Sequence, residues 1–196
     1  MMSPDTIKII LISHLLLFES MFFVKNIFLS KKLKGSIRGK NKEASISIIL
    51  FAVTIIIAVA SILSGYLNEL FIPIPLLSND YLIFTGMFLL FLNLIISVLA
   101  LIQMRDSWRV GIKEDDKTDL IIGGIFKITR NPYFVSYIVL FLAYILLVAN
   151  VLIIISSLLA FISIHKMIMK EEKYLEALHG DNYLDYKKNV PRYLLI

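Results

Sequence analysis

Hydrophobic positions along the chain gather in five long runs that are separated by polar connections. The first three runs cover about residues 7–28, 44–66 and 81–104, and each is long enough to cross about 30 Å of hydrocarbon as a helix. The last two runs, 132–148 and 151–164, are shorter and almost adjacent. The pattern predicts an all-α integral membrane protein with five transmembrane helices, of which the last two form a tight antiparallel hairpin.

Prolines and glycines mark where these predicted helices begin and end. Pro73 and Pro75 follow the second run and predict an extended connection. Pro132 suits the first turn of the fourth helix, and Asn131 before it is the expected N-cap. Beyond the fifth run the periodicity stays helical while the composition turns polar. This helix is therefore expected to project into water, end near Gly180 and lead into a C-terminal helical extension.

Basic residues predict the orientation of the spans. Lysines and arginines cluster after the first, third and fifth runs, whereas the connections after the second and fourth runs contain none. Because such clusters stay on the cytoplasmic side, we expect the N-terminus outside the cell, and the C-terminus and its helical extension in the cytoplasm. Trp108, just past the third run, is expected to anchor the protein at the membrane interface.

The composition agrees with a membrane protein. The 196 residues are 58% hydrophobic with a mean hydropathy of +0.82, whereas soluble folds are about 45–50% apolar. We expect one membrane domain, 1–196, in which 1–104 form three N-terminal spans and 105–196 form a cytosolic loop, the last two spans and the C-terminal helices. The membrane explains the net charge of +5, and a nucleic-acid partner is not expected, because no groove of interleaved basic and aromatic residues is present.

Most familiar catalytic motifs are missing from the sequence. There is no GxSxG elbow, HExxH pair or phosphate-binding glycine loop, and the absence of cysteine excludes thiolate nucleophiles and cysteine-based metal sites. The histidines His14, His165 and His179 are too scattered for a metal site, so no metal is expected. His14 and Glu19 lie inside the first span, where ionisable groups are either functional or polar contacts between packed helices.

Polar and charged residues lie at both ends of the predicted hairpin, within residues 119–180. The hairpin would bring Arg130, beside a helix N-terminus, and the pair Glu171 and Glu172 to one membrane face. The helix N-terminus and the guanidinium can hold a carboxylate, and the glutamates can hold an amine, ribose hydroxyls or a sulfonium. A zwitterionic cofactor with a positive centre would fit both, although the same residues also suit lipid phosphates and a solvated helix face.

An ordered set of residues runs through the C-terminal half of the chain. Its members are Thr118-Asp119-Leu120-Ile121, Gly124, Phe126, Arg130-Asn131-Pro132, Phe134, Glu171-Glu172, Leu175, His179-Gly180, Tyr183, Tyr186 and Val190-Pro191. In residue type, order and spacing, this set resembles the isoprenylcysteine carboxyl methyltransferases and the related phospholipid methyltransferases. The first three runs match that family only in number and topology.

The resemblance implies a membrane methyltransferase that depends on S-adenosylmethionine and has its site on the cytoplasmic face. The residues that would line the cofactor site are Thr118, Leu120, Ile121, Phe126, Asn131, Pro132, Phe134 and Glu171. Arg130 and Glu172 would be the catalytic residues, in a supporting role. Methyl transfer from an activated sulfonium needs mainly positioning and the exclusion of water.

The acceptor implied by the resemblance is a lipid or a prenylated small molecule or protein, and a prenylcysteine-type carboxylate is favoured. The family's arginine four residues before the first glutamate is Met167 here, which keeps a phospholipid amine or a lipidic phenol or enol as alternatives. Two family histidines become Thr118 and Asn131, which still form hydrogen bonds. A noncatalytic membrane scaffold or a small transporter is the alternative from another class. A transporter would place paired charges inside the membrane, whereas the polar residues here concentrate at one face.

Overall fold

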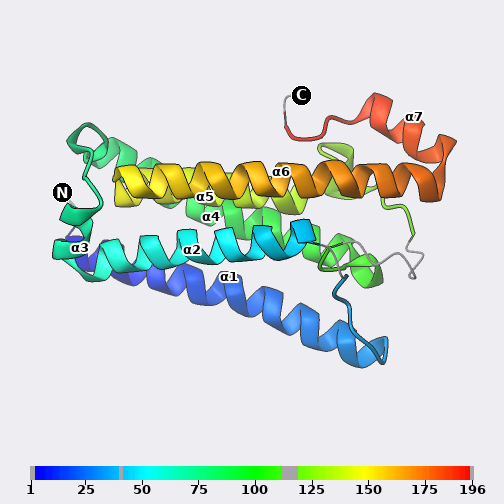
Figure 1. Ribbon diagram of the computed structural model, residues 1–196, viewed down its shortest axis with the longest axis horizontal. Helices are drawn as coiled ribbons and strands as arrows, with labels where there is room; N and C mark the ends of the chain where they lie inside the picture. Colours follow the sequence, from blue (N-terminus) through cyan, green and yellow to red (C-terminus); the bar gives the residue numbers. More distant parts are fainter. Residues whose placement is uncertain (1–2, 40–41, 112–118, 195–196) are drawn as a thin grey trace.

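Five long helices run side by side and form the body of the molecule (Figure 1). They are α1 (Pro4–Lys32), α2 (Lys42–Leu63), α4 (Asp80–Gln103), α5 (Pro132–Val148) and α6 (Val151–His179). The short elements are the helices α3 (Gly65–Leu70) and α7 (Asp181–Asn189) and the 3₁₀ turns η1 (Pro75–Leu77), η2 (Arg105–Ser107) and η3 (Gly124–Lys127). This computed structural model describes residues 3–39, 42–111 and 119–194, and no β-strand is formed within these ranges.

The predicted membrane spans are present as helices. In the described part of the chain, α1, α2, α4 and α6 are long and apolar enough to cross a membrane, and α5 is a shorter apolar helix of 17 residues. At about 1.5 Å per residue, α5 covers about 25 Å. The all-helical membrane fold is therefore confirmed, with α5, the fourth predicted span, at the short end of the range for a span.

Polar side chains at helix starts explain two of the boundaries. Asn150 starts α6, where its side-chain oxygen accepts a hydrogen bond from the backbone N–H of Ile153 at 2.9 Å. The prediction that the second span reaches residue 66 is wrong, since α2 ends at Leu63. Ser64 instead begins the separate helix α3, because its hydroxyl accepts a hydrogen bond from the backbone N–H of Leu67 at 3.3 Å.

The helices pack most closely in two pairs, α4 with α5 and α2 with α6. Small residues line the seam between α2 and α6, where Ala58 and Ala160 are buried and the hydroxyl oxygens of Ser47 and Ser163 lie 2.9 Å apart. Small side chains let membrane helices approach closely, and hydroxyl pairs add hydrogen bonds across the seam. The seam therefore holds α2 firmly against α6.

α1 makes fewer close contacts with the other long helices. His14 Nε2 lies 3.0 Å from Asn93 Oδ1, and Asn93 Nδ2 donates to the carbonyl of Ser136 at 2.8 Å. These bonds tie α1 to α4 and α5, so His14 and Asn93 form polar contacts between packed helices. Beyond His14, α1 diverges from α2 toward one end of the bundle (Figure 1).

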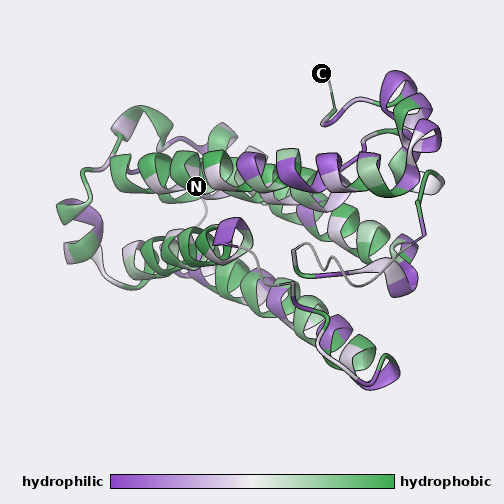
Figure 2. Ribbon diagram, turned by 45° about the vertical axis from the view of Figure 1, so that its right-hand side comes forward, coloured by the Kyte–Doolittle hydropathy of each residue, from purple (hydrophilic) through white to green (hydrophobic). Residues whose placement is uncertain are grey.

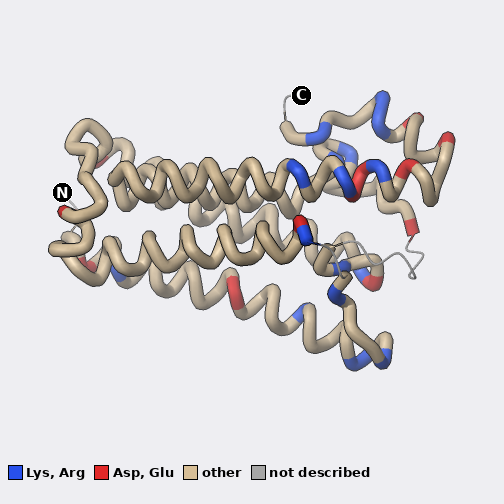
Figure 3. Tube along the Cα trace, in the orientation of Figure 1, with Lys and Arg blue, Asp and Glu red and all other residues tan. Residues whose placement is uncertain are grey.

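Lysines and arginines gather at the end of the bundle formed by the last turn of α1, the segment after α4, the C-terminal part of α6 and α7, which we call the basic end (Figure 3). The rest of the body is largely apolar (Figure 2). Large apolar side chains such as Phe23, Phe84 and Phe88 are exposed on its outer surface. An apolar surface beside a charged end is typical of a helix bundle that lies in a bilayer.

Candidate active site

A cavity of about 830 Å³ opens at the basic end and extends between α1 and α2. Side chains from α1, α2, α5, α6 and α7 line it, together with residues of the segments that follow α1 and α4. Its volume is within the range of ligand sites, about 300–1,000 Å³. The cavity has two parts with different chemistry, which we call the polar arm and the apolar arm.

The polar arm lies where α5 begins and the polar part of α6 passes. It is lined by Asp119, Leu120, Ile121, Phe126, Arg130, Asn131, Pro132, Phe134, Glu171, Leu175, Tyr183 and Tyr186. Seven of the predicted cofactor residues belong to this set, namely Leu120, Ile121, Phe126, Asn131, Pro132, Phe134 and Glu171. Thr118 lies outside the described residues. The hairpin thus brings the two ends of residues 119–180 to one cavity, while the role of these residues in cofactor binding stays a prediction.

The apolar arm lies between α1 and α2. It is lined by Leu15, Leu16, Phe18, Glu19, Phe22, Phe51, Ala52, Ile55, Ile56 and Tyr137. On α1 this arm extends from Leu15 to Phe22, a separation of about 10 Å along the helix. Its mostly apolar lining suits a hydrocarbon chain.

Gly124 shapes the wall of the polar arm. Its φ of +59° is in the left-handed region, and a Cβ at this position would overlap the side-chain amide of Gln103. That amide oxygen accepts a hydrogen bond from the backbone N–H of Ile125 at 2.7 Å, and the Tyr186 hydroxyl donates to the carbonyl of Phe126 at 2.6 Å. Burial raises the pKa of Tyr186, so the hydroxyl keeps its proton. α4 and α7 together hold Phe126 against the cavity.

Arg130 and Glu172 form a buried ion pair beside the polar arm. Arg130 Nη2 lies 3.1 Å from Glu172 Oε1, and the two side chains are 8% and 4% exposed. Arg130 Nη1 donates to the carbonyl oxygens of Lys187 and Val190. Glu172 does not line the cavity, because its carboxylate faces Arg130 and Arg192. The two residues predicted to be catalytic therefore bind each other in this structure.

Arg192 completes this cluster, and the sequence pattern does not point to it. Its Nε donates to Glu172 Oε1 at 3.1 Å and its Nη2 to Oε2 at 3.0 Å. The hydrogen bond to this carboxylate raises the pKa of Arg192. The carbonyl of Arg192 also accepts hydrogen bonds from the Thr129 hydroxyl at 2.9 Å and from Asn131 Nδ2 at 3.3 Å. The one feature of the sequence that could have pointed to Arg192 is its position directly after Pro191, the last residue of the ordered set.

Asn131 is the N-cap residue of α5, as predicted, although its side chain makes no capping hydrogen bond. Asn131 Nδ2 donates to Glu172 Oε1 at 3.2 Å instead. This bond links the start of α5 to α6. It also leaves the N-terminus of α5 without a side-chain cap beside the polar arm.

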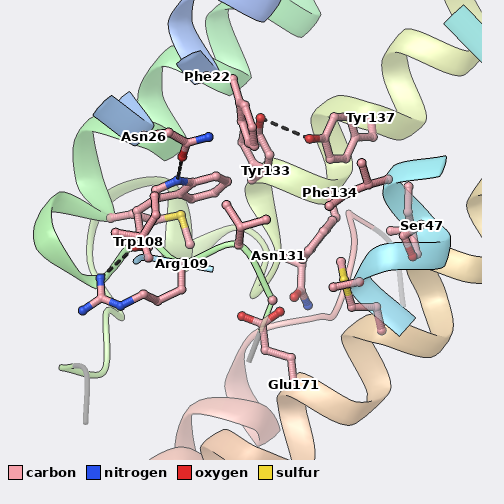
Figure 4. A pocket seen from close by; sticks show the side chains of 18 of the residues that line it. Phe22, Asn26, Ser47, Trp108, Arg109, Asn131, Tyr133, Phe134, Tyr137 and Glu171 are labelled. Atoms are coloured by element: carbon pink, nitrogen blue, oxygen red, sulfur yellow. Dashed lines mark hydrogen bonds between the residues drawn. The ribbon is translucent and has the colours of Figure 1, made fainter. Parts of the chain in front are cut away.

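Glu171 is the member of the glutamate pair that points into the cavity (Figure 4). Its side chain is partly buried and makes no hydrogen bond or ion pair with any residue that the structure describes. Glu172, at the next position of α6, is turned toward the arginines. The two adjacent glutamates thus differ in their partners. Glu171 can bind a ligand in the cavity, whereas Glu172 forms ion pairs with Arg130 and Arg192.

An aromatic wall lines the cavity where the two arms meet (Figure 4). The ring centroids of Trp108 and Tyr133 are 4.7 Å apart, those of Tyr133 and Tyr137 are 4.9 Å apart, and Phe22 lies 5.6 Å from Trp108. The Trp108 indole N–H donates to Asn26 Oδ1 at 2.8 Å. The prediction of an interfacial anchor is therefore wrong, since Trp108 is 4% exposed and packs within the protein. The family resemblance covers only the C-terminal half of the chain, so it could not predict that α1 residues such as Phe22 and Asn26 take part in this wall.

Comparison with known protein families shows independently to which family the chain belongs. Residues 81–182 match the phospholipid methyltransferase family model, from α4 to the first turn of α7. No curated protein matches the chain. The matched region is just over half of the chain and includes most residues of the polar arm. The chain therefore belongs to the phospholipid methyltransferase family, which it shares with the isoprenylcysteine carboxyl methyltransferases that its C-terminal half resembles.

Proposed function

We propose that this protein transfers a methyl group from S-adenosylmethionine to a lipophilic acceptor within the membrane. The observation that carries the proposal is one continuous cavity, which joins a polar arm at the basic end to an apolar arm between α1 and α2. A water-soluble cofactor and a lipid can meet in such a space. Membership in a family of membrane methyltransferases supports the same reaction.

The cofactor is assigned to the polar arm. S-adenosylmethionine carries a purine, ribose hydroxyls, an ammonium group and a carboxylate. Glu171 can accept hydrogen bonds from the hydroxyls or the ammonium group, and the uncapped N-terminus of α5 suits the carboxylate. Phe126 and Phe134 offer apolar rings to the purine. The other residues of the proposed cofactor site are Thr118, Leu120, Ile121, Asn131 and Pro132.

When bound, S-adenosylmethionine supplies a methyl group that its positively charged sulfur already activates. The protein then needs no strong acid or base, and its residues act by orienting the reactants and excluding water. The packed rings of Trp108, Tyr133 and Tyr137 offer an apolar surface where the arms meet, which would help to exclude water from the reactants. Arg130 and Glu172 act as positioning residues, because their ion pair fixes the start of α5 against α6.

The basic end is assigned to the cytoplasm and the N-terminus to the outside. This orientation follows the distribution of lysines and arginines, which gather at the end that carries α7 (Figure 3). The polar arm then opens on the cytoplasmic side, and membrane lipids surround the apolar outer surface. No role in binding nucleic acid is proposed.

The prenylcysteine-type carboxylate that the resemblance implies stays a prediction for the acceptor. The apolar arm favours it, since the lining of this arm suits a hydrocarbon chain. Met167 counts against it, because this side chain lines the cavity where the resemblance implies an arginine, and a thioether offers no charge to a carboxylate. An amine, phenol or enol on a lipid does not need that arginine.

Cofactor binding by the purified full chain tests the proposal. We expect saturable binding of labelled S-adenosylmethionine in equilibrium dialysis. Glu171→Gln should weaken it about tenfold, because a hydrogen bond to a charged group contributes about 1.5–3 kcal/mol. The matched control is Glu176→Gln, which removes a carboxylate of the same helix that pairs with Lys187 outside the cavity. Equal affinities of the Glu171→Gln and unaltered proteins would remove Glu171 from the site.

Methyl transfer itself is tested in native membranes that contain the protein. We expect label from the methyl group of S-adenosylmethionine to appear in the lipid extract, and we expect Glu171→Gln membranes to incorporate less. Binding of the cofactor without any labelled lipid would support the noncatalytic alternative.

A further inference from the structure

Glu19 is an acidic residue inside the apolar arm of the cavity. It lies on the face of α1 that also carries Leu15 and Phe22, four and three residues away, and its neighbour Phe18 lines the same cavity. A charged side chain at the centre of a membrane helix is costly and is usually offset by a partner. Among the described residues, Glu19 has no hydrogen bond or ion pair that would offset this cost. Its position therefore points to a cation that comes from outside the protein.

Aromatic rings surround the same part of the cavity. The ring centroids of Phe18 and Tyr137 are 5.9 Å apart, those of Phe51 and Tyr137 are 4.9 Å apart, and those of Phe22 and Tyr133 are 6.4 Å apart. Aromatic rings attract cations through their electron-rich faces, and the attraction strengthens where water is excluded. Rings beside a carboxylate therefore favour an ammonium group over a neutral or anionic group.

Basic side chains that line the cavity lie outside the residues that define the apolar arm. Arg38 and Arg109 lie in the segments that follow α1 and α4, and Arg130 is paired with Glu172. The apolar arm, as defined above, contains no lysine or arginine. Within the described chain, no lysine or arginine of the apolar arm therefore competes with a ligand for the Glu19 carboxyl group.

Glu19 lies close to the place where the two arms meet. Phe22, one turn or about 5 Å further along α1, contacts both Trp108 and Tyr133 of the aromatic wall. Tyr133 directly follows Pro132, which lines the polar arm. A head group held by Glu19 would therefore lie next to the proposed cofactor site, with its hydrocarbon chain in the apolar arm.

We propose that Glu19 and the rings of Phe18, Phe22 and Tyr137 form an ammonium-binding site that selects acceptors with a cationic head group. This assignment rests on the proposed function and names the residue that sets its acceptor preference. Glu19 precedes residues 81–182, so the family match assigns no role to it. A carboxylate head group would be repelled by Glu19 and would gain no attraction from Met167.

Trp108 provides the signal for a direct test, because it is the only tryptophan of the chain and its ring packs against Phe22. The purified full chain in an uncharged detergent is titrated with dodecylammonium and with dodecanoate, which share one chain length and carry opposite charges. We expect dodecylammonium to change the tryptophan fluorescence saturably, with an apparent affinity about tenfold higher than that of dodecanoate. Equal or tighter binding of dodecanoate would overturn the proposal.

Three variants identify the residue responsible. Glu19→Gln should abolish the preference for dodecylammonium, whereas Glu19→Asp should retain most of it because the charge is kept. Glu69→Gln is the matched control, since it removes an exposed carboxylate at the opposite end of the bundle and should leave the preference unchanged. A Glu19→Gln protein that still prefers the ammonium probe would show that Glu19 does not form the site.

Binding of S-adenosylmethionine, measured on the same samples, separates this inference from the proposed function. Glu19→Gln should bind the cofactor as the unaltered protein does, which also shows that the variant is folded. A lower cofactor affinity at an unchanged melting temperature would place Glu19 in the cofactor site and overturn the inference. If the unaltered protein binds no cofactor but prefers the ammonium probe, the proposed function fails and the ammonium site stands.

Discussion

Glu171 and Glu172 are neighbours in α6, and we expect their replacement to have different effects. Glu172→Gln leaves Arg130 without its counter-charge at a buried position, and breaking a buried ion pair costs about 3–5 kcal/mol. The melting temperature in detergent should therefore fall markedly for Glu172→Gln. It should change little for Glu171→Gln, because Glu171 faces the cavity and has no partner among the described residues. Equal destabilisation by both changes would contradict this division of roles.

The polar arm also depends on an element, the turn η3, and on one glycine within it. We expect Gly124→Ala to destabilise the protein by more than about 1 kcal/mol, because alanine is strained at a positive φ and its Cβ would collide with Gln103. The collision would displace Phe126 from the polar arm and lower the affinity for S-adenosylmethionine. Gly123→Ala is the matched control in chemical denaturation and in dialysis, since Gly123 has φ −97° and open space around it. Similar results for both changes would show that η3 does not shape the site.

The helices could be predicted from the sequence more fully than the contacts between them. A chain in a bilayer must satisfy its backbone hydrogen bonds within each helix, so long apolar runs predict helices well. The end of α2 was missed because Ser64 restarts the helix with its own cap. The cavity-lining face of α1 was not predictable, because a helix in lipid is apolar on all sides and shows no stripe toward the interior. Arg192 was missed for a related reason, since its pairing with Glu172 depends on how the C-terminal segment folds back.

The whole molecule should insert with its basic end in the cytoplasm. The chain lacks cysteine, so single cysteines can report on the side at which each end lies. We expect a membrane-impermeant maleimide to label Ser78→Cys, near η1, in intact cells, and to label Lys188→Cys in α7 only after permeabilisation. Both positions are exposed, so each variant is the control for the other. The reverse labelling pattern would invert the proposed topology.

The way α1 is attached has a consequence for the kinetics of the whole molecule. α1 is bonded to α4 and α5 at His14, and beyond this residue it diverges from α2 and leaves the apolar arm between them. A hydrocarbon tail can then slide in sideways from the bilayer and never needs to pass through water. The acceptor would be drawn from a two-dimensional reservoir. We therefore expect the reaction rate to follow the mole fraction of acceptor among the surrounding lipids, and to fall when inert lipid dilutes it at a constant bulk concentration.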